Sequence, residues 1–173
     1  GSDGAGGGRC GCISVRVGRL PFTDPLKRGG NVERCLRELG YAVVPTKGTS
    51  MWPLLKEGES RVQLAVPDGR PLRKGDIVLY RRKDGTLVLH RIVRLSEPGT
   101  YVTCGDHQWK ADEWVTDEQI LAVAQGFFRK GQYFDEHTWW YRLYQTLWNG
   151  NLVVRRFCLA LLRLSGLEKR GIK

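Results

Sequence analysis

A serine in a turn-forming segment is the first residue of this 173-residue chain whose setting suits chemistry. Ser50 lies in the segment 47–55, which reads Lys-Gly-Thr-Ser-Met-Trp-Pro-Leu-Leu. Gly48 allows a tight backbone turn, and Pro53 fixes its own φ angle and has no amide proton, so the segment favours a rigid turn. Free backbone N–H groups beside Ser50 would suit an oxyanion hole. The alternative is a solvated loop serine, because a serine needs a base nearby to act as a nucleophile.

A histidine in a strand-like segment is the candidate for that base. Alternation along residues 86–93 places His90 on the same face as Val88 and Ile92, and places Arg91 on the opposite face. Both faces are largely apolar, so His90 is expected to be partly buried and to need a hydrogen-bond partner. The alternative is a structural core histidine whose hydrogen bonds are satisfied.

Two carboxylates in one polar loop are candidates for the partner of this histidine. Asp106 and Asp112 follow a short apolar segment and lie in the stretch 104–113, Cys-Gly-Asp-His-Gln-Trp-Lys-Ala-Asp-Glu. Either carboxylate could orient a histidine and stabilise its imidazolium form. The alternative for each is to cap a turn, as loop aspartates commonly do.

Most of the elements that must position these residues are predicted to be strands. A helix is expected to begin after Asn31 and to stop at Gly40, and a helical turn is expected between Thr116 and Gln119. Asp84-Gly85 predicts a hairpin turn. Strands are expected at 41–44, 61–66, 76–81, 86–94, 101–104 and 120–128. The predicted fold class is mainly β with peripheral helices, built on a curled, antiparallel sheet or partial barrel.

The chain divides into three segments by composition. Residues 1–30 are Gly-rich and irregular, residues 31–130 hold the candidate site, and residues 131–173 form a basic, aromatic, helical extension. Within the extension, helices are expected at 137–147 and 152–164. Aromatic and basic side chains together suit a helix in a membrane interface, and they suit a helical hairpin packed on the sheet about equally well.

Charge and composition restrict the possible functions. The net charge of +10 makes nucleic acid and anionic membranes the acidic partners to consider. No apolar segment is long enough to span a membrane and no secretory signal is visible, so we expect a cytoplasmic protein, with peripheral membrane contact as an option. The five cysteines are scattered without zinc-site spacing, so neither a disulfide framework nor a metal site is expected.

Four segments in order resemble the type I signal peptidases, specifically the endoplasmic-reticulum and archaeal branch that pairs serine with histidine. This fold is shared with the self-cleaving domain of SOS repressors. The similar segments are Gly-Thr-Ser-Met-Trp-Pro-Leu-Leu at 48–55, Arg-Lys-Gly-Asp-Ile-Val-Leu-Tyr at 73–80, Val-Leu-His-Arg-Ile-Val at 88–93 and Gly-Asp-His-Gln at 105–108.

The resemblance implies a role for each candidate residue. Ser50 would be the nucleophile, with Gly48 and Met51 beside it in the groove, and its backbone N–H would contribute to the oxyanion hole. His90 would be the general base. Asp112 lies six residues beyond Asp106, at the family's offset for the third catalytic member, so Asp112 is the first choice and Asp106 the second. The family cleaves peptides or preproteins after small residues and needs no cofactor.

Departures from the family pattern keep other functions open. Gly48 stands where many signal peptidases have a serine that helps to bind the oxyanion, and no N-terminal membrane anchor is visible. A leader segment of a cytoplasmic precursor is therefore the expected substrate. The alternatives are a catalytically inactive peptide-binding module of the same fold and, less favoured, a DNA-binding regulator. The regulator would need a helix-turn-helix, whereas residues 1–40 predict one helix.

Overall fold

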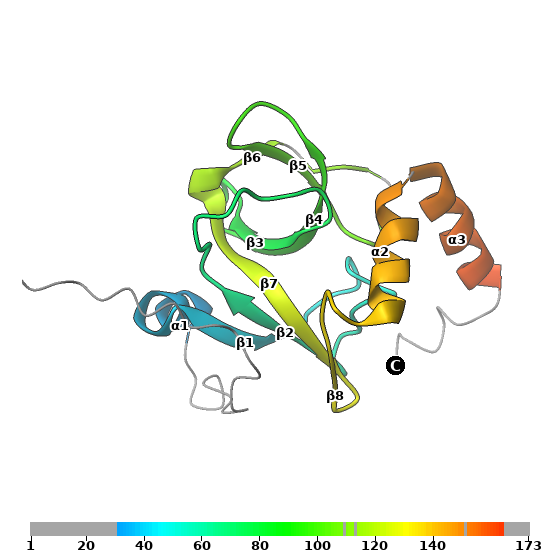
Figure 1. The fold of residues 1–173 in the computed structure, drawn as a ribbon, viewed down its shortest axis with the longest axis horizontal. Coiled ribbons are helices and arrows are strands. Elements are labelled where there is room, and N and C mark those ends of the chain that lie inside the picture. The colour runs from blue at the N-terminus through cyan, green and yellow to red at the C-terminus, as the bar shows by residue number, and fades with distance from the viewer. Residues whose placement is uncertain (1–30, 109, 113, 151, 165–173) are drawn as a thin grey trace, which may run out of the picture.

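The computed structural model of this protein describes residues 31–108, 110–112, 114–150 and 152–164 (Figure 1). The segment 1–30, which the sequence predicts to be irregular, lies outside the described residues.

The described part of the chain has one curled antiparallel sheet at its centre, as the sequence predicts (Figure 1). Seven strands follow the order β1-β2-β7-β3-β4-β5-β6, and β8 pairs with β7. The strands β6 and β8 are new relative to the sequence prediction, because three residues are too few to show a periodic pattern. The strands are β1 (Tyr41–Pro45), β2 (Ser60–Ala65), β3 (Ile77–Arg81), β4 (Leu87–Leu95), β5 (Thr100–Cys104), β6 (Trp114–Thr116), β7 (Ile120–Arg129) and β8 (Gln132–Phe134).

Irregular pairing explains why the sheet curls. The register shifts between Gln63 and Leu64 where β2 meets β7, and between Leu79 and Tyr80 where β3 meets β7. A third shift lies between Ile92 and Arg94 where β4 meets β5. Each extra residue bends its strand and increases the local twist. The result is a half-barrel rather than a flat sheet.

The strand β3 is buried on both faces of this sheet. Ile77 and Leu79 belong to a core cluster that also contains residues of α1 (Val32–Leu39), β2 and β7. Val78 and Tyr80 belong to a second cluster, which they share with residues of β4, β5, β6 and β7. Alternation of side chains across the strand produces this division. The strand β4, which carries His90, is paired directly with this buried strand.

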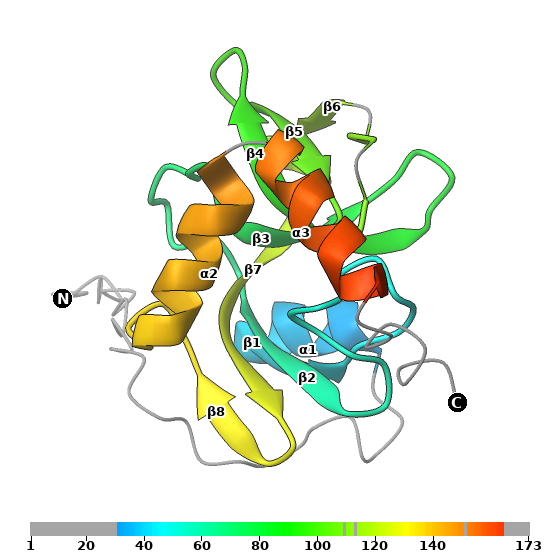
Figure 2. The ribbon, with the colours of Figure 1, turned by 90° about the vertical axis from the view of Figure 1, so that its right-hand side faces the viewer.

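Each of the predicted helices is present. Asn31 caps α1 by accepting a hydrogen bond from the backbone N–H of Glu33, and Gly40 ends this helix in a left-handed conformation. The turn after Thr116 is the 3-10 helix η2 (Asp117–Gln119), which has a capping box. The helices α2 (Trp139–Gly150) and α3 (Leu152–Leu164) lie side by side against the sheet (Figure 2).

The two C-terminal helices bury one set of side chains and expose another. Tyr141, Trp148, Arg155 and Leu159 are buried, which is the packed arrangement that the sequence left as one of two options. The outward-facing surface still carries large apolar side chains, with Trp139 76% exposed among them. Within the described residues, no helix has both the length and the apolar character needed to cross a membrane.

Candidate active site

Ser50 lies in a compact loop between β1 and β2. The loop turns twice, with the Trp52 N–H donating to the Thr49 carbonyl at 3.0 Å and the Leu55 N–H donating to the Met51 carbonyl at 2.9 Å. Met51 and Leu55 are buried in the core cluster, so the loop is held from below by apolar packing. Ser50 itself stays partly exposed at the surface of this anchored turn.

The loop is also held from the side. Arg129 of β7 donates from Nη1 to the Pro53 carbonyl at 2.8 Å. The His107 N–H donates to the Ser50 carbonyl at 2.8 Å, which joins the serine loop to the loop that follows β5. The loop that carries Ser50 is therefore held by two segments that are far away in sequence.

His90 of β4 contacts Asp112 through Nδ1 and Oδ2, and its side chain is only 3% exposed. The partner that the sequence requires for a buried histidine is therefore Asp112. The N–H of Asp112 donates to the Thr103 carbonyl at 2.8 Å, and Tyr80 donates from its hydroxyl to Asp112 Oδ2 at 2.9 Å. Arg82 forms an ion pair with the other oxygen of the carboxylate. These contacts hold Asp112 facing the histidine.

Burial and charge act in opposite directions on this pair. Burial lowers the pKa of His90, although Asp112 partly offsets the effect. Burial acts to raise the pKa of Asp112, but the charge and hydrogen bond of His90, the Tyr80 hydroxyl and Arg82 together bring it below its usual value. Near neutral pH the carboxylate is therefore ionised and the imidazole is neutral. A neutral imidazole held by a carboxylate is a suitable general base.

Ser50 and His90 line the same groove, which has a volume of about 680 Å³. They also meet at Gly105. A Cβ atom at Gly105 would lie 2.6 Å from the Ser50 carbonyl oxygen and 3.1 Å from His90 Nε2, so both atoms approach the same point. Because His90 Nδ1 faces Asp112, Nε2 is the nitrogen that remains for the serine side of the groove. The sequence-predicted residues Gly48 and Met51 also line the groove.

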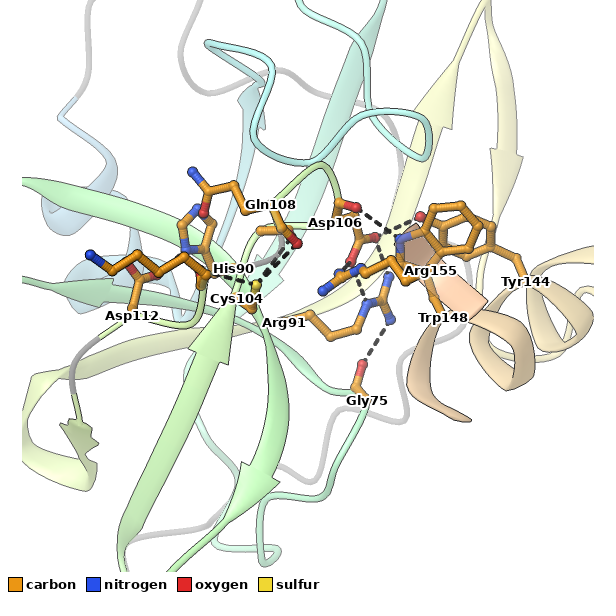
Figure 3. A network of polar contacts seen from close by, with 12 residues as sticks. Gly75, His90, Arg91, Cys104, Asp106, Gln108, Asp112, Tyr144, Trp148 and Arg155 are labelled. Carbon is orange, nitrogen blue, oxygen red and sulfur yellow. Dashed lines mark hydrogen bonds and ion pairs between the residues drawn. The ribbon is translucent and has the colours of Figure 1, made fainter. Parts of the chain in front are cut away.

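Asp106, the second-choice carboxylate, has different neighbours from Asp112 (Figure 3). It is fully buried and accepts hydrogen bonds from Arg91 Nε at 2.8 Å and from Arg91 Nη2 at 2.7 Å. Arg155 and Tyr144, from the C-terminal helices, also donate to its carboxylate. Figure 3 shows His90 and Asp112 to one side of this network and the helical residues to the other. The structure thus brings Asp112, and not Asp106, to the histidine.

Several residues around the site were not singled out from the sequence. Tyr80 and Arg82 contact Asp112, and Gln108 lines the serine groove. A second cavity, of about 670 Å³, shares Arg82 and Gln108 with the groove and is also lined by Asp112 and Trp114. Tyr80 lies in one of the segments that resemble signal peptidases, but no property of the residue alone indicated its contact with Asp112.

Among residues 31–164 that the structure describes, no three His, Cys, Asp or Glu side chains are grouped so as to hold a metal ion. A serine, a buried histidine and an ionised carboxylate are the side-chain types that serine hydrolases use.

Comparison with curated proteins shows a partial similarity to signal peptidase I W of Bacillus subtilis (strain 168). The two sequences are 32% identical over 92 residues, which is 51% of this chain and 48% of that protein. This chain therefore spans about half the length of the relative. No family model matches the chain. The distant similarity supports a relationship to signal peptidase I over the matched segment.

Proposed function

We propose that this protein is a serine endopeptidase of signal-peptidase type that uses Ser50, His90 and Asp112, the catalytic set of the Ser-His branch. The contact between His90 and Asp112 is the observation that carries the proposal, because it leaves His90 Nε2 for a groove that Ser50 also lines.

The proposed reaction proceeds in two stages. His90 Nε2 takes the proton from Ser50 Oγ as the oxygen attacks the peptide carbonyl carbon, and Asp112 stabilises the imidazolium that forms. The same nitrogen then gives the proton to the leaving amine as the carbon–nitrogen bond breaks, which leaves an ester on Ser50. Water, activated by His90, hydrolyses this ester and releases the new carboxyl group.

The oxyanion is proposed to be bound by backbone N–H groups of the serine loop. Gly48 has no hydroxyl to contribute, and its φ of 74° suits a tight turn in which only glycine is unstrained. The N–H of Ser50 is the proposed donor, and its position is held through the bond from the His107 N–H to the Ser50 carbonyl. Electrostatic stabilisation of this kind is usually a large part of catalysis in acyl transfer.

The proposed substrate is a leader or signal-like peptide that is cleaved after a small residue. Apolar residues of β1 and β4, such as Val44 and Leu89, line the groove beside Ser50 and suit an apolar, extended segment. Contact with an anionic membrane through α2 and α3 stays a prediction. Their exposed apolar side chains would supply the contact, and co-sedimentation of the protein with anionic vesicles measures it.

The test of the proposed function is reaction with a serine-directed acylating probe, followed by intact mass. We expect a single adduct in the wild-type protein and none in Ser50→Ala or His90→Gln. Ser96→Ala is the matched control, because Ser96 is exposed and lies outside the groove. Absence of a Ser50-dependent adduct, together with unchanged affinity for candidate peptides in Ser50→Ala, would favour the inactive peptide-binding module.

A further inference from the structure

The C-terminal helices donate hydrogen bonds to Asp106, which lies in the loop after β5. Arg155 of α3 donates from Nη2 to Asp106 Oδ1 at 2.8 Å, and Tyr144 of α2 donates from its hydroxyl to Asp106 Oδ2 at 2.8 Å. Trp148 donates from its indole N–H to the Asp106 carbonyl at 2.9 Å. Arg91 of β4 binds the same carboxylate from the sheet side. Asp106 is thus the point at which the sheet and both helices are joined (Figure 3).

This network is not the arrangement that stability alone would favour. Two guanidinium groups share one carboxylate, and all three side chains are fully buried. Arg155 Nε and Nη1 are also buried and have no hydrogen-bond partner among the described residues. Buried donors without partners are costly, and buried ion networks are often less stabilising than apolar packing of similar volume. Fixing the position of Asp106 is a role that explains such a costly arrangement.

The neighbours of Asp106 contact the serine loop. The N–H of His107 donates to the Ser50 carbonyl at 2.8 Å. Gly105, on the other side of Asp106, approaches both that carbonyl and His90 Nε2. A displacement of Asp106 would therefore move the backbone groups that hold Ser50 and border His90. The path of contacts from Arg155 to Ser50 therefore passes only through Asp106 and His107.

A second contact joins the helices directly to the serine loop. Trp52, two residues after Ser50, forms a buried cluster with Trp148 of α2 and Leu159 of α3. Its ring also lies 5.2 Å from that of His107, measured between centroids. The helices thus pack on both loops that carry the candidate site, the serine loop and residues 105–108.

We infer that the α2–α3 hairpin is a positioning element of the active site, in which Arg155 holds residues 105–108 against Ser50 and His90. Arg155 touches neither the groove nor the reacting atoms, so it is a positioning residue and not a catalytic one. The effect on catalysis rests on the proposed function, whereas the effect on the loop does not. Small displacements of reacting groups lower the rate strongly because catalysis depends on their alignment.

Arg155→Met tests this inference, with Arg156→Met as the matched control. Arg156 is the next residue of the same helix and is exposed. Arg155→Met leaves Asp106 paired with Arg91, so the variant is expected to fold with a Tm near that of the wild type. We expect the exchange rate of the His107 amide proton, which is bonded to the Ser50 carbonyl, to rise about tenfold in Arg155→Met alone.

The kinetic readout separates positioning from folding. We expect kcat, or the rate of acylation of Ser50 by the probe, to fall about tenfold in Arg155→Met with KM changed by less than about twofold. Arg155→Lys, which retains the positive charge and one donor nitrogen, is expected to restore part of the rate. Tyr144→Phe removes only the hydroxyl that binds Asp106, so it repeats the test if Arg155→Met does not fold.

The outcomes distinguish this inference from the proposed function. Equal exchange of the His107 amide in Arg155→Met and Arg156→Met would overturn the inference, whatever the activity. Wild-type acylation rates in both Arg155→Met and Tyr144→Phe would also overturn it. A protein without any Ser50-dependent adduct, but with faster exchange in Arg155→Met, would refute the peptidase and keep the link between the helices and the loop.

Discussion

Gly105 offers the sharpest perturbation of the candidate site, because it is the point where the serine loop and the histidine come together. The Cβ atom of an alanine at this position would lie 2.6 Å from the Ser50 carbonyl oxygen and 3.1 Å from His90 Nε2. The first distance is shorter than folded proteins tolerate, and the oxygen belongs to the backbone, so no side-chain rotation can relieve the contact. Gly105 is not among the glycines with positive φ, so the effect arises from the contact and not from backbone strain.

The size of the effect follows from how far the loops must move. The Ser50 backbone and the loop at Gly105 must separate by several tenths of an ångström, which also stretches the bond between the His107 N–H and the Ser50 carbonyl. Misplacement on this scale is expected to lower kcat/KM by about tenfold to hundredfold. Overpacking of this kind is also expected to cost about 1–3 kcal/mol in the free energy of unfolding.

The assay for Gly105→Ala compares the acylation rate of Ser50 with the Tm of the same variant. Gly69→Ala is the control, because Gly69 has a φ of 86° and open space around its Cβ position. Alanine there is expected to cost about 1–2 kcal/mol through backbone strain and to leave the acylation rate unchanged. A folded Gly105→Ala variant that retains the wild-type rate would refute the placement of Ser50 and His90 around Gly105.

The remaining predictions concern the charged groups. The lowered pKa of His90 means that activity should rise with pH through a midpoint below the usual histidine value of about 6.5, since the neutral imidazole is the base. A midpoint above about 6.5 in a kcat/KM profile would contradict this assignment. Asp112→Asn should fold, lower kcat by about 10²–10⁴-fold and move that midpoint further toward acid, because the ionised carboxylate acts to raise the pKa of His90. Asp106→Asn should instead lower the free energy of unfolding in urea by about 3–5 kcal/mol, because Arg91 and Arg155 are left buried without a countercharge. If Asp106→Asn lost activity without losing stability, the roles given to Asp106 and Asp112 would be reversed.

The β elements could be predicted from the sequence because each has its own local pattern. The helix from Val32 and the strands around the candidate site lie within one or two residues of their expected bounds. Caps and glycine stops, such as Asn31 and Gly40, define the ends of α1. Patterns of this kind depend on neighbours in sequence, so they predict a curled sheet but not the positions at which its strands bend. The curl depends on register shifts such as the one at Leu79 and Tyr80, which have no local sequence signature.

The hairpin between β3 and β4 shows how small a detail decides the site. A two-residue turn at Asp84-Gly85 would place Leu79 opposite His90. In the structure the Arg82 N–H donates to the Thr86 carbonyl, the loop has three residues, and Val78 lies opposite His90. A shift of one residue exchanges the faces of a strand. With the observed register, Tyr80 lies on the His90 face and reaches Asp112, a contact that the sequence alone could not provide.

The separate surroundings of Asp106 and Asp112 depend on residues that no sequence spacing connects. Asp112 is held by Tyr80 and Arg82 of the β3–β4 hairpin, which carry a hydroxyl and a single cation to a partly exposed carboxylate. Asp106 instead receives two buried cations, one of them Arg155, from a helix far along the chain. A carboxylate neutralised in this way is suited to fix a loop in place, and a carboxylate that contacts a neutral, buried histidine is suited to orient a base. The loop after β5 therefore carries two carboxylates with different contacts. Asp112 contacts His90, and Asp106 is bound by the helical extension that packs against the residues bordering Ser50.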